Sequence, residues 1–254
     1  MGRRLCAALT LLLVFAEISP AAASGKPHTG RSWTYAFVTG AVTPDWSFTA
    51  MPGVRAEFAR DQGDSLGHYM DEFFIGPNWV RKFGAAWIRT SLWYYFAGYD
   101  NLAPSYVQTH NLALIATAGV RLGPFAVSAR STFLNTFYSD LYGTASQRRG
   151  YSVILCEKIK ITYELRPGLA LLLATEPFIG LVADGEAAPS MIGFMRTGLL
   201  LNRLYAGVSW RPTPNLSIEP QYVYHTDFDG SGNPIQHNHY LFVVVGYRFK
   251  FFEE

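Results

Sequence analysis

A strict alternation of apolar and polar residues, sustained over segments of about 11–15 residues, constrains this chain more than any other feature. In the clearest segment, near the C-terminus, apolar residues occupy one face: Leu241, Val243, Val245, Tyr247 and Phe249. A period of two is that of a β-strand with one apolar face. These segments exceed the roughly 5–6 residues usual in globular sheets and are long enough for the roughly 9–11 that cross a bilayer when tilted. The pattern predicts an all-β fold, an antiparallel transmembrane β-barrel.

Eleven such segments can be delimited, at residues 32–42, 46–58, 68–80, 85–97, 107–121, 124–137, 151–165, 168–181, 198–211, 215–226 and 238–250. Bacterial single-chain barrels have even strand numbers, and with eleven strands the first and the last would run in the same direction. Either 32–42 is not a full strand, which leaves ten, or one segment hides two strands, which gives twelve. We predict 10–12 strands and slightly favour twelve, with a hidden division between residues 189 and 210.

The connections between these segments differ in length. Those at residues 122–124 and 166–168 are short and carry the Pro and Gly that tight turns require. Those at residues 139–150 and 182–197 are much longer. Short connections on one side and long ones on the other predict short periplasmic turns and longer extracellular loops, the layout of outer-membrane barrels.

The first 23 residues have the three parts of a secretory signal. Arg3 and Arg4 give a positive start, residues 5–15 are apolar, and Ala21-Ala22-Ala23 is a small-residue cleavage pattern. The apolar part is too short for a transmembrane helix, which needs about 20 residues. We therefore predict a signal peptide over 1–23, a single barrel domain over 24–254, and a location in the cell outer membrane of a diderm bacterium.

The composition agrees with this location and limits the partners. Charged residues make up 16% of the chain, against roughly 25% in ordinary soluble domains. A formal net charge of +2 gives no reason to expect nucleic acid. The expected partners are outer-membrane lipid, the barrel-assembly machinery, periplasmic chaperones and a small solute of unidentified chemistry. We expect the apolar face of the last segment to be the C-terminal assembly signal: Leu241, Val243, Val245, Tyr247 and Phe249.

If the apolar faces meet lipid, the opposite faces line the lumen. A charge facing lipid at mid-depth costs about 2–4 kcal/mol for Arg or Lys, so the charged residues are predicted to point inward. They are Arg55, Glu57, Arg89, Arg121, Arg130, Lys158, Lys160, Glu164, Glu176, Arg203, Arg211, Glu219 and Arg248. Basic groups outnumber acidic ones. They form either structural ion pairs that fill a narrow barrel or the wall of a constricted, anion-preferring pore.

The sequence offers little catalytic chemistry. It has no H-E-x-x-H pair and no Gly-rich phosphate loop, and we expect no catalytic residue, no metal and no cofactor. The weak metal candidates are His237 and His239 on one strand face, with His225 across a connection. Cys156 is predicted to be a small apolar filler.

Several residues of the C-terminal half resemble an uncharacterised family of bacterial outer-membrane barrels (domain-of-unknown-function family 2490). They are residues 202–208, the turn at 212–216, the segment 218–222 and the final strand from His239 to Phe249. Outside this half, Ser32-Trp33 and His110 resemble the family more weakly. The resemblance implies the barrel fold and the outer-membrane location. It implies no activity and no site residues.

Three functions follow from these observations. The leading one is a narrow pore or structural membrane protein, which is not an enzyme. The second is a lipid-acting hydrolase of the lipid A deacylase or phospholipase type, which would need a serine paired with a histidine at the lipid-facing rim. The third is a secreted soluble β-barrel that binds an apolar ligand.

Overall fold

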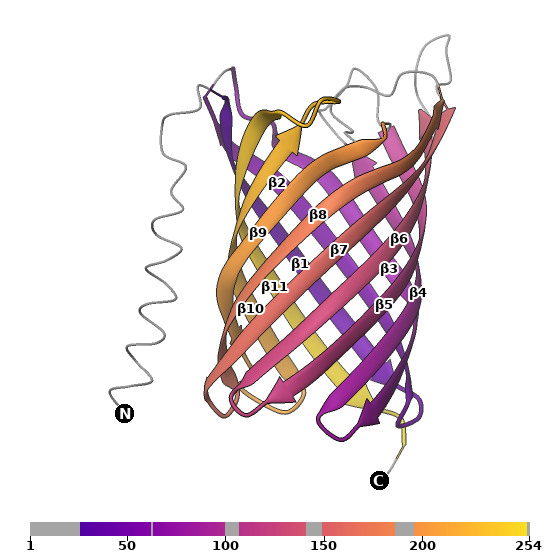
Figure 1. Ribbon diagram of the computed structural model, residues 1–254, viewed down its shortest axis with the longest axis vertical. Helices are drawn as coiled ribbons and strands as arrows, with labels where there is room; N and C mark the ends of the chain where they lie inside the picture. The colour runs from indigo at the N-terminus through magenta and orange to yellow at the C-terminus, as the bar shows by residue number, and fades with distance from the viewer. Residues whose placement is uncertain (1–25, 62, 100–106, 141–148, 186–195, 253–254) are drawn as a thin grey trace.

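A computed structural model describes residues 26–61, 63–99, 107–140, 149–185 and 196–252. The predicted signal peptide lies outside the described residues. The strands are β1 (His28–Ala41), β2 (Trp46–Arg60), β3 (Gly67–Phe83), β4 (Ala86–Tyr99), β5 (Val107–Leu122), β6 (Phe125–Asp140), β7 (Arg149–Arg166), β8 (Leu169–Gly185), β9 (Gly198–Trp210), β10 (Leu216–Phe228) and β11 (Pro234–Lys250). They close into one barrel (Figure 1), which confirms the predicted all-β barrel fold. Within the described residues, no helix is long and apolar enough to cross a membrane.

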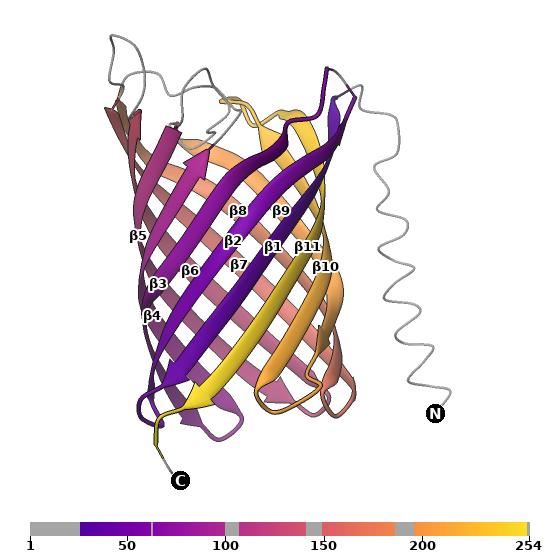
Figure 2. The same ribbon diagram turned by 180° about the vertical axis from the view of Figure 1, so that it is seen from behind.

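The barrel closes through a parallel pair of strands. Ten of the eleven neighbouring pairs are antiparallel, and β1 pairs with β11 in parallel from His28↔His237 to Ala41↔Lys250. In Figure 2 these two strands lie side by side with both arrowheads at the lower end. The described chain thus falls inside the predicted range of 10–12 strands. The preference for twelve was wrong, because parallel strands also form a regular hydrogen-bond ladder and can join the two free edges of an odd sheet.

The two rims of the barrel differ. Connections are 2 to 5 residues long at one rim, the short-turn rim, and 5 to 12 residues long at the other, the long-connection rim. Gly84 and Gly123 open two-residue turns with φ of +61°, a conformation that glycine adopts without steric cost. Because β1 and β11 are parallel, β1 begins at the long-connection rim and β11 ends at the short-turn rim (Figure 1).

The outer face of the barrel is apolar and the inner face is polar. Large apolar side chains such as Val54, Leu112, Leu114 and Leu241 are about half exposed and point outward. Buried polar side chains, among them Glu57, Glu72, Asn78 and Glu176, point inward. This inside-out distribution is the one that a bilayer selects, because apolar groups can face lipid whereas charges cannot.

Aromatic rings lie over inward-facing glycines on the neighbouring strand. Tyr35 of β1 is the register partner of Gly53, and a Cβ on Gly53 would lie 2.1 Å from the Tyr35 ring. Trp87 covers its partner Gly119 in the same way. Glycine within a strand often marks such close approach, so these contacts fix the register where the wall curves.

Candidate functional site in the lumen

A cavity of about 1540 Å³ runs along the inside of the barrel. Its wall reaches from Pro27 and Gln236 at the long-connection rim to Gly84 and Pro214 at the short-turn rim. This volume exceeds the 300–1,000 Å³ typical of small-molecule sites. The lumen therefore holds space along its length and is not wholly filled by side chains.

The cavity wall is strongly basic. Among the described residues, thirteen basic side chains line it: Arg31, Arg55, Arg60, Lys82, Arg89, Arg121, Arg130, Lys158, Lys160, Arg196, Arg203, Arg211 and Arg248. Four acidic side chains of the same part of the chain line it: Glu72, Glu176, Glu219 and Asp227. A low-dielectric cleft lined by one sign of charge concentrates counter-ions of the other sign.

The structure places eleven of the thirteen residues predicted for the lumen on this wall: Arg55, Arg89, Arg121, Arg130, Lys158, Lys160, Glu176, Arg203, Arg211, Glu219 and Arg248. The other two are held in ion pairs beside it. Glu57 is buried between Arg31 and Arg60, with oxygen–nitrogen distances of 2.9 and 2.7 Å. Glu164 pairs with Arg121 at 3.0 Å near the short-turn rim, where both side chains are partly exposed.

Glu72 of β3 is the centre of a buried polar cluster in the half of the barrel nearer the long-connection rim. It accepts hydrogen bonds from the Arg55 guanidinium through Nε (2.7 Å) and Nη2 (2.8 Å), a two-pronged pair. Trp33 Nε1 (2.9 Å) and the Tyr95 hydroxyl (2.6 Å) donate to the same carboxylate. Four donors on one buried carboxylate satisfy it fully, as a charge removed from water requires.

Arginine side chains that stack on aromatic rings extend this cluster across the lumen. The Arg55 guanidinium lies 3.9 Å from the centre of the Trp33 ring. The Arg203 guanidinium of β9 lies 5.0 Å from the same ring and 4.5 Å from the ring of Phe178 in β8. The contact of Trp33 in β1 with Arg203 in β9 thus joins the two sides, and the lumen is narrowed at this level.

A second buried carboxylate, Glu176 of β8, gathers basic groups nearer the short-turn rim. Arg130 and the hydroxyl of Tyr205 both donate to it. Lys158 Nζ lies 3.5 Å from the carboxylate and 3.4 Å from the centre of the Tyr205 ring. One carboxylate therefore balances two cations.

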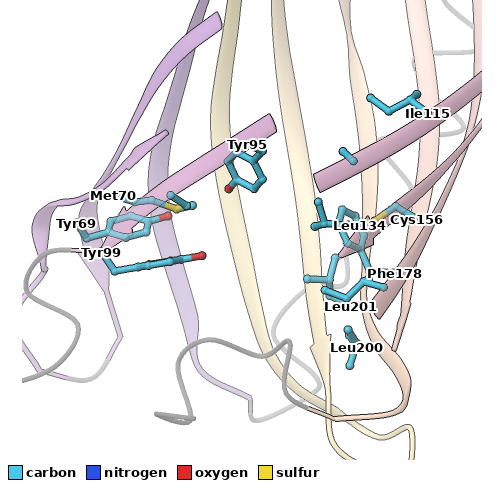
Figure 3. Close-up of a cluster of buried hydrophobic side chains, with 13 residues drawn as sticks. Tyr69, Met70, Tyr95, Tyr99, Ile115, Leu134, Cys156, Phe178, Leu200 and Leu201 are labelled. Atoms are coloured by element: carbon cyan, nitrogen blue, oxygen red, sulfur yellow. The ribbon is translucent and has the colours of Figure 1, made fainter. Parts of the chain in front are cut away.

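Apolar side chains also line the lumen, in the half nearer the long-connection rim. Figure 3 shows Tyr69, Met70 and Tyr99 grouped on one side and Leu134, Cys156 and Phe178 on the other. Cys156 is buried in this cluster, as a filler residue would be. Together, the apolar cluster and the Glu72 cluster limit the width of any path through the barrel.

Of the three histidines considered as metal candidates, His225 is separated from His237 and His239. His225 faces the lumen, where its Nε2 lies 2.9 Å from Asp227. His237 and His239 point to the outside of the barrel. The Nε2 atom of His239 lies 2.9 Å from Nδ1 of His28. Within the described residues, no cluster of His, Cys, Asp and Glu could hold a metal ion. Grouping His225 with the other two was wrong because neighbouring strands can present residues to opposite sides of the sheet, whereas His237 and His239 share one strand face as expected.

The predicted assembly-signal residues lie on the outward face of β11. Leu241 is 60% exposed and Tyr247 is 48% exposed, whereas Tyr240 and Phe242, on either side of Leu241, point into the lumen. The sequence analysis predicted only charged residues for the lumen wall, so it did not predict the aromatic residues Tyr240 and Phe242 there. Strand alternation already placed Tyr240 on the inward face, and that signal could have found it.

Comparison with known proteins relates the chain to other barrels by fold alone. No family model and no curated protein matches the sequence. Among solved structures, the NanC porin aligns with a TM-score of 0.53 and 8% identity, over 89% of this chain and 100% of that one. The translocator domain of the autotransporter NalP from Neisseria meningitidis aligns with a TM-score of 0.46 and 13% identity, over 98% and 97%. The described chain therefore has a barrel fold similar to that of a porin.

Proposed function

We propose that this protein is a narrow, anion-preferring pore of a bacterial outer membrane. The observation that carries the proposal is the basic wall of the lumen cavity, to which the described residues contribute thirteen Arg and Lys against four Asp and Glu. Such a wall raises the local concentration of anions and repels cations. The narrowing at Trp33, Arg55 and Arg203 favours small solutes over large ones.

The outward apolar face and the predicted signal peptide support the membrane location. A soluble barrel would expose many large apolar side chains to water, among them Phe48, Leu114 and Leu241. A lipid-acting hydrolase would need a hydroxyl, an imidazole and a third group that orients it. On the outer face, the hydroxyl of Thr226 lies 3.2 Å from His237 Nδ1, and the hydroxyl of Tyr224 contacts the same nitrogen. The imidazole nitrogen that would activate the Thr226 hydroxyl is therefore shared with a second group. The basic lumen favours the pore over these alternatives.

Conductance across a planar bilayer tests the proposal. The folded protein should give discrete current steps, and in a KCl gradient the reversal potential should show anion preference. Replacing two cavity-lining cations near the short-turn rim, Lys82→Gln with Arg211→Gln, should reduce this preference. Arg81→Gln, outside the lumen and paired with Asp45, should leave it unchanged. Insertion without conductance, or cation preference, would contradict the proposal.

A further inference from the structure

Three buried donors without hydrogen-bond partners lie in one row across the lumen wall. Among the described residues, buried side-chain atoms that lack a partner include Arg89 Nε, Thr117 Oγ1 and Arg130 Nε. Arg89 is the register partner of Thr117 on β5, and Thr117 is the register partner of Arg130 on β6. All three residues line the cavity. We call them the Arg89–Thr117–Arg130 row.

The row carries more positive charge than the described residues neutralise. Within the described part of the chain, Arg89 makes no ion pair, and the charges that act on it come from Arg130 and Arg248, which are both basic. The carboxylate of Glu176 reaches Arg130 but is shared with Lys158. Like charges held this close are unfavourable unless an anion lies between them.

The donors match an oxyanion in number and geometry. A guanidinium presents Nε–H and Nη–H as a fork that fits two oxygens of one carboxylate, phosphate or sulfate. Residues opposite each other on neighbouring strands start only about 5 Å apart, so Thr117 lies between Arg89 and Arg130 along the row and faces the same cavity. A halide offers a single acceptor atom, whereas an oxyanion offers several to several donors.

We propose that the Arg89–Thr117–Arg130 row is a binding site for a small oxyanion, a free solute that bears a phosphate, sulfate or carboxylate group. The site rests on the proposed pore, because it gives the lumen a point of selection for its solute. It also explains why a buried donor without a partner is tolerated, since the ligand completes the hydrogen bonds that the chain leaves open.

Equilibrium binding of radiolabelled inorganic phosphate to the detergent-folded protein, at constant chloride concentration, tests the site without requiring conduction. Wild-type protein should bind phosphate saturably, and unlabelled sulfate and acetate should compete where additional chloride does not. Arg89→Gln and the near-isosteric Thr117→Val should each weaken binding about tenfold or more. Arg89→Lys should weaken it as well, because lysine keeps the charge but lacks the fork. Arg81→Gln is the matched control outside the lumen.

The outcomes separate the site from the pore. A heat-dependent gel shift verifies first that each variant is folded, and only folded variants are compared. Absence of phosphate binding to the wild type, equal binding by wild type and Arg89→Gln, or equal competition by chloride overturns the site. Binding without conductance supports the site and overturns the pore, whereas conductance without binding does the reverse.

Discussion

At the scale of single residues, Glu72 is a buried charge whose loss should destabilise the barrel. Its side chain is fully buried and accepts four hydrogen bonds, two of them from Arg55. Glu72→Gln keeps the shape but leaves the Arg55 guanidinium without its carboxylate. Breaking a buried ion pair on one side costs about 3–5 kcal/mol, so the free energy of unfolding should fall by that amount. Urea unfolding of the barrel in lipid vesicles measures it.

The matched control is Glu164→Gln, which breaks the partly exposed pair with Arg121. An exposed pair contributes about 0–1 kcal/mol, so its loss should be small. Removing both partners of the buried pair, with Glu72→Gln and Arg55→Gln together, should cost less than the sum of the single changes. Equal losses for Glu72→Gln and Glu164→Gln would contradict the central role of the Glu72 cluster.

Alternation predicted which charged residues point inward, but it could not predict their partners. Arg203 and Trp33 meet across the lumen although three strand pairings separate β9 from β1 around the wall. Shifts in strand register also make some inward-facing residues impossible to predict from alternation. Tyr69 and Met70 are consecutive and both buried, next to the register shift at Arg55 and Ala56, where a strict period of two fails.

At the scale of strands, the contact of Tyr35 with Gly53 holds β1 and β2 in register. The Tyr35 ring cannot retreat easily, because it packs edge-on against Phe74 and Phe242. Gly53→Ala should therefore destabilise the barrel by about 1–3 kcal/mol, the usual cost of overpacking. Thermal unfolding followed by the gel shift measures the change. Gly230→Ala is the control, since a Cβ there meets nothing within 4 Å, and it should be nearly neutral.

Strand positions were predicted closely because lipid and lumen impose opposite demands on successive residues. The last predicted segment, 238–250, ends where β11 ends. The start of β1 was placed four residues late, at Ser32 instead of His28. Here the outward residues His28, Gly30 and Ser32 are not apolar, so the alternating pattern carries no signal although the chain continues as a strand.

At the scale of the whole molecule, the odd strand number has a consequence for sidedness. Parallel pairing of β1 with β11 puts the start of β1 and the end of β11 at opposite rims. An even barrel would put both at the same rim. Sequence reasoning detected the conflict between eleven segments and an even count, but it resolved the conflict by changing the count, because a parallel closure leaves no mark on the hydrophobic pattern.

Single cysteines at the two ends of the barrel distinguish these arrangements. In a background of Cys156→Ser, with Cys6 removed in the predicted signal peptide, Lys26→Cys and Phe251→Cys each provide one thiol beside an end strand, and both positions are exposed. A membrane-impermeant maleimide applied to intact cells should label the thiol at 26, at the rim of the longer connections, and not the thiol at 251. Permeabilising the outer membrane should make both reactive. Labelling of both thiols in intact cells, or of neither, would mean that the first and last strands are antiparallel. The basic lumen would then be enclosed by an even number of strands, and a solute would follow a different path past Arg89 and Arg130.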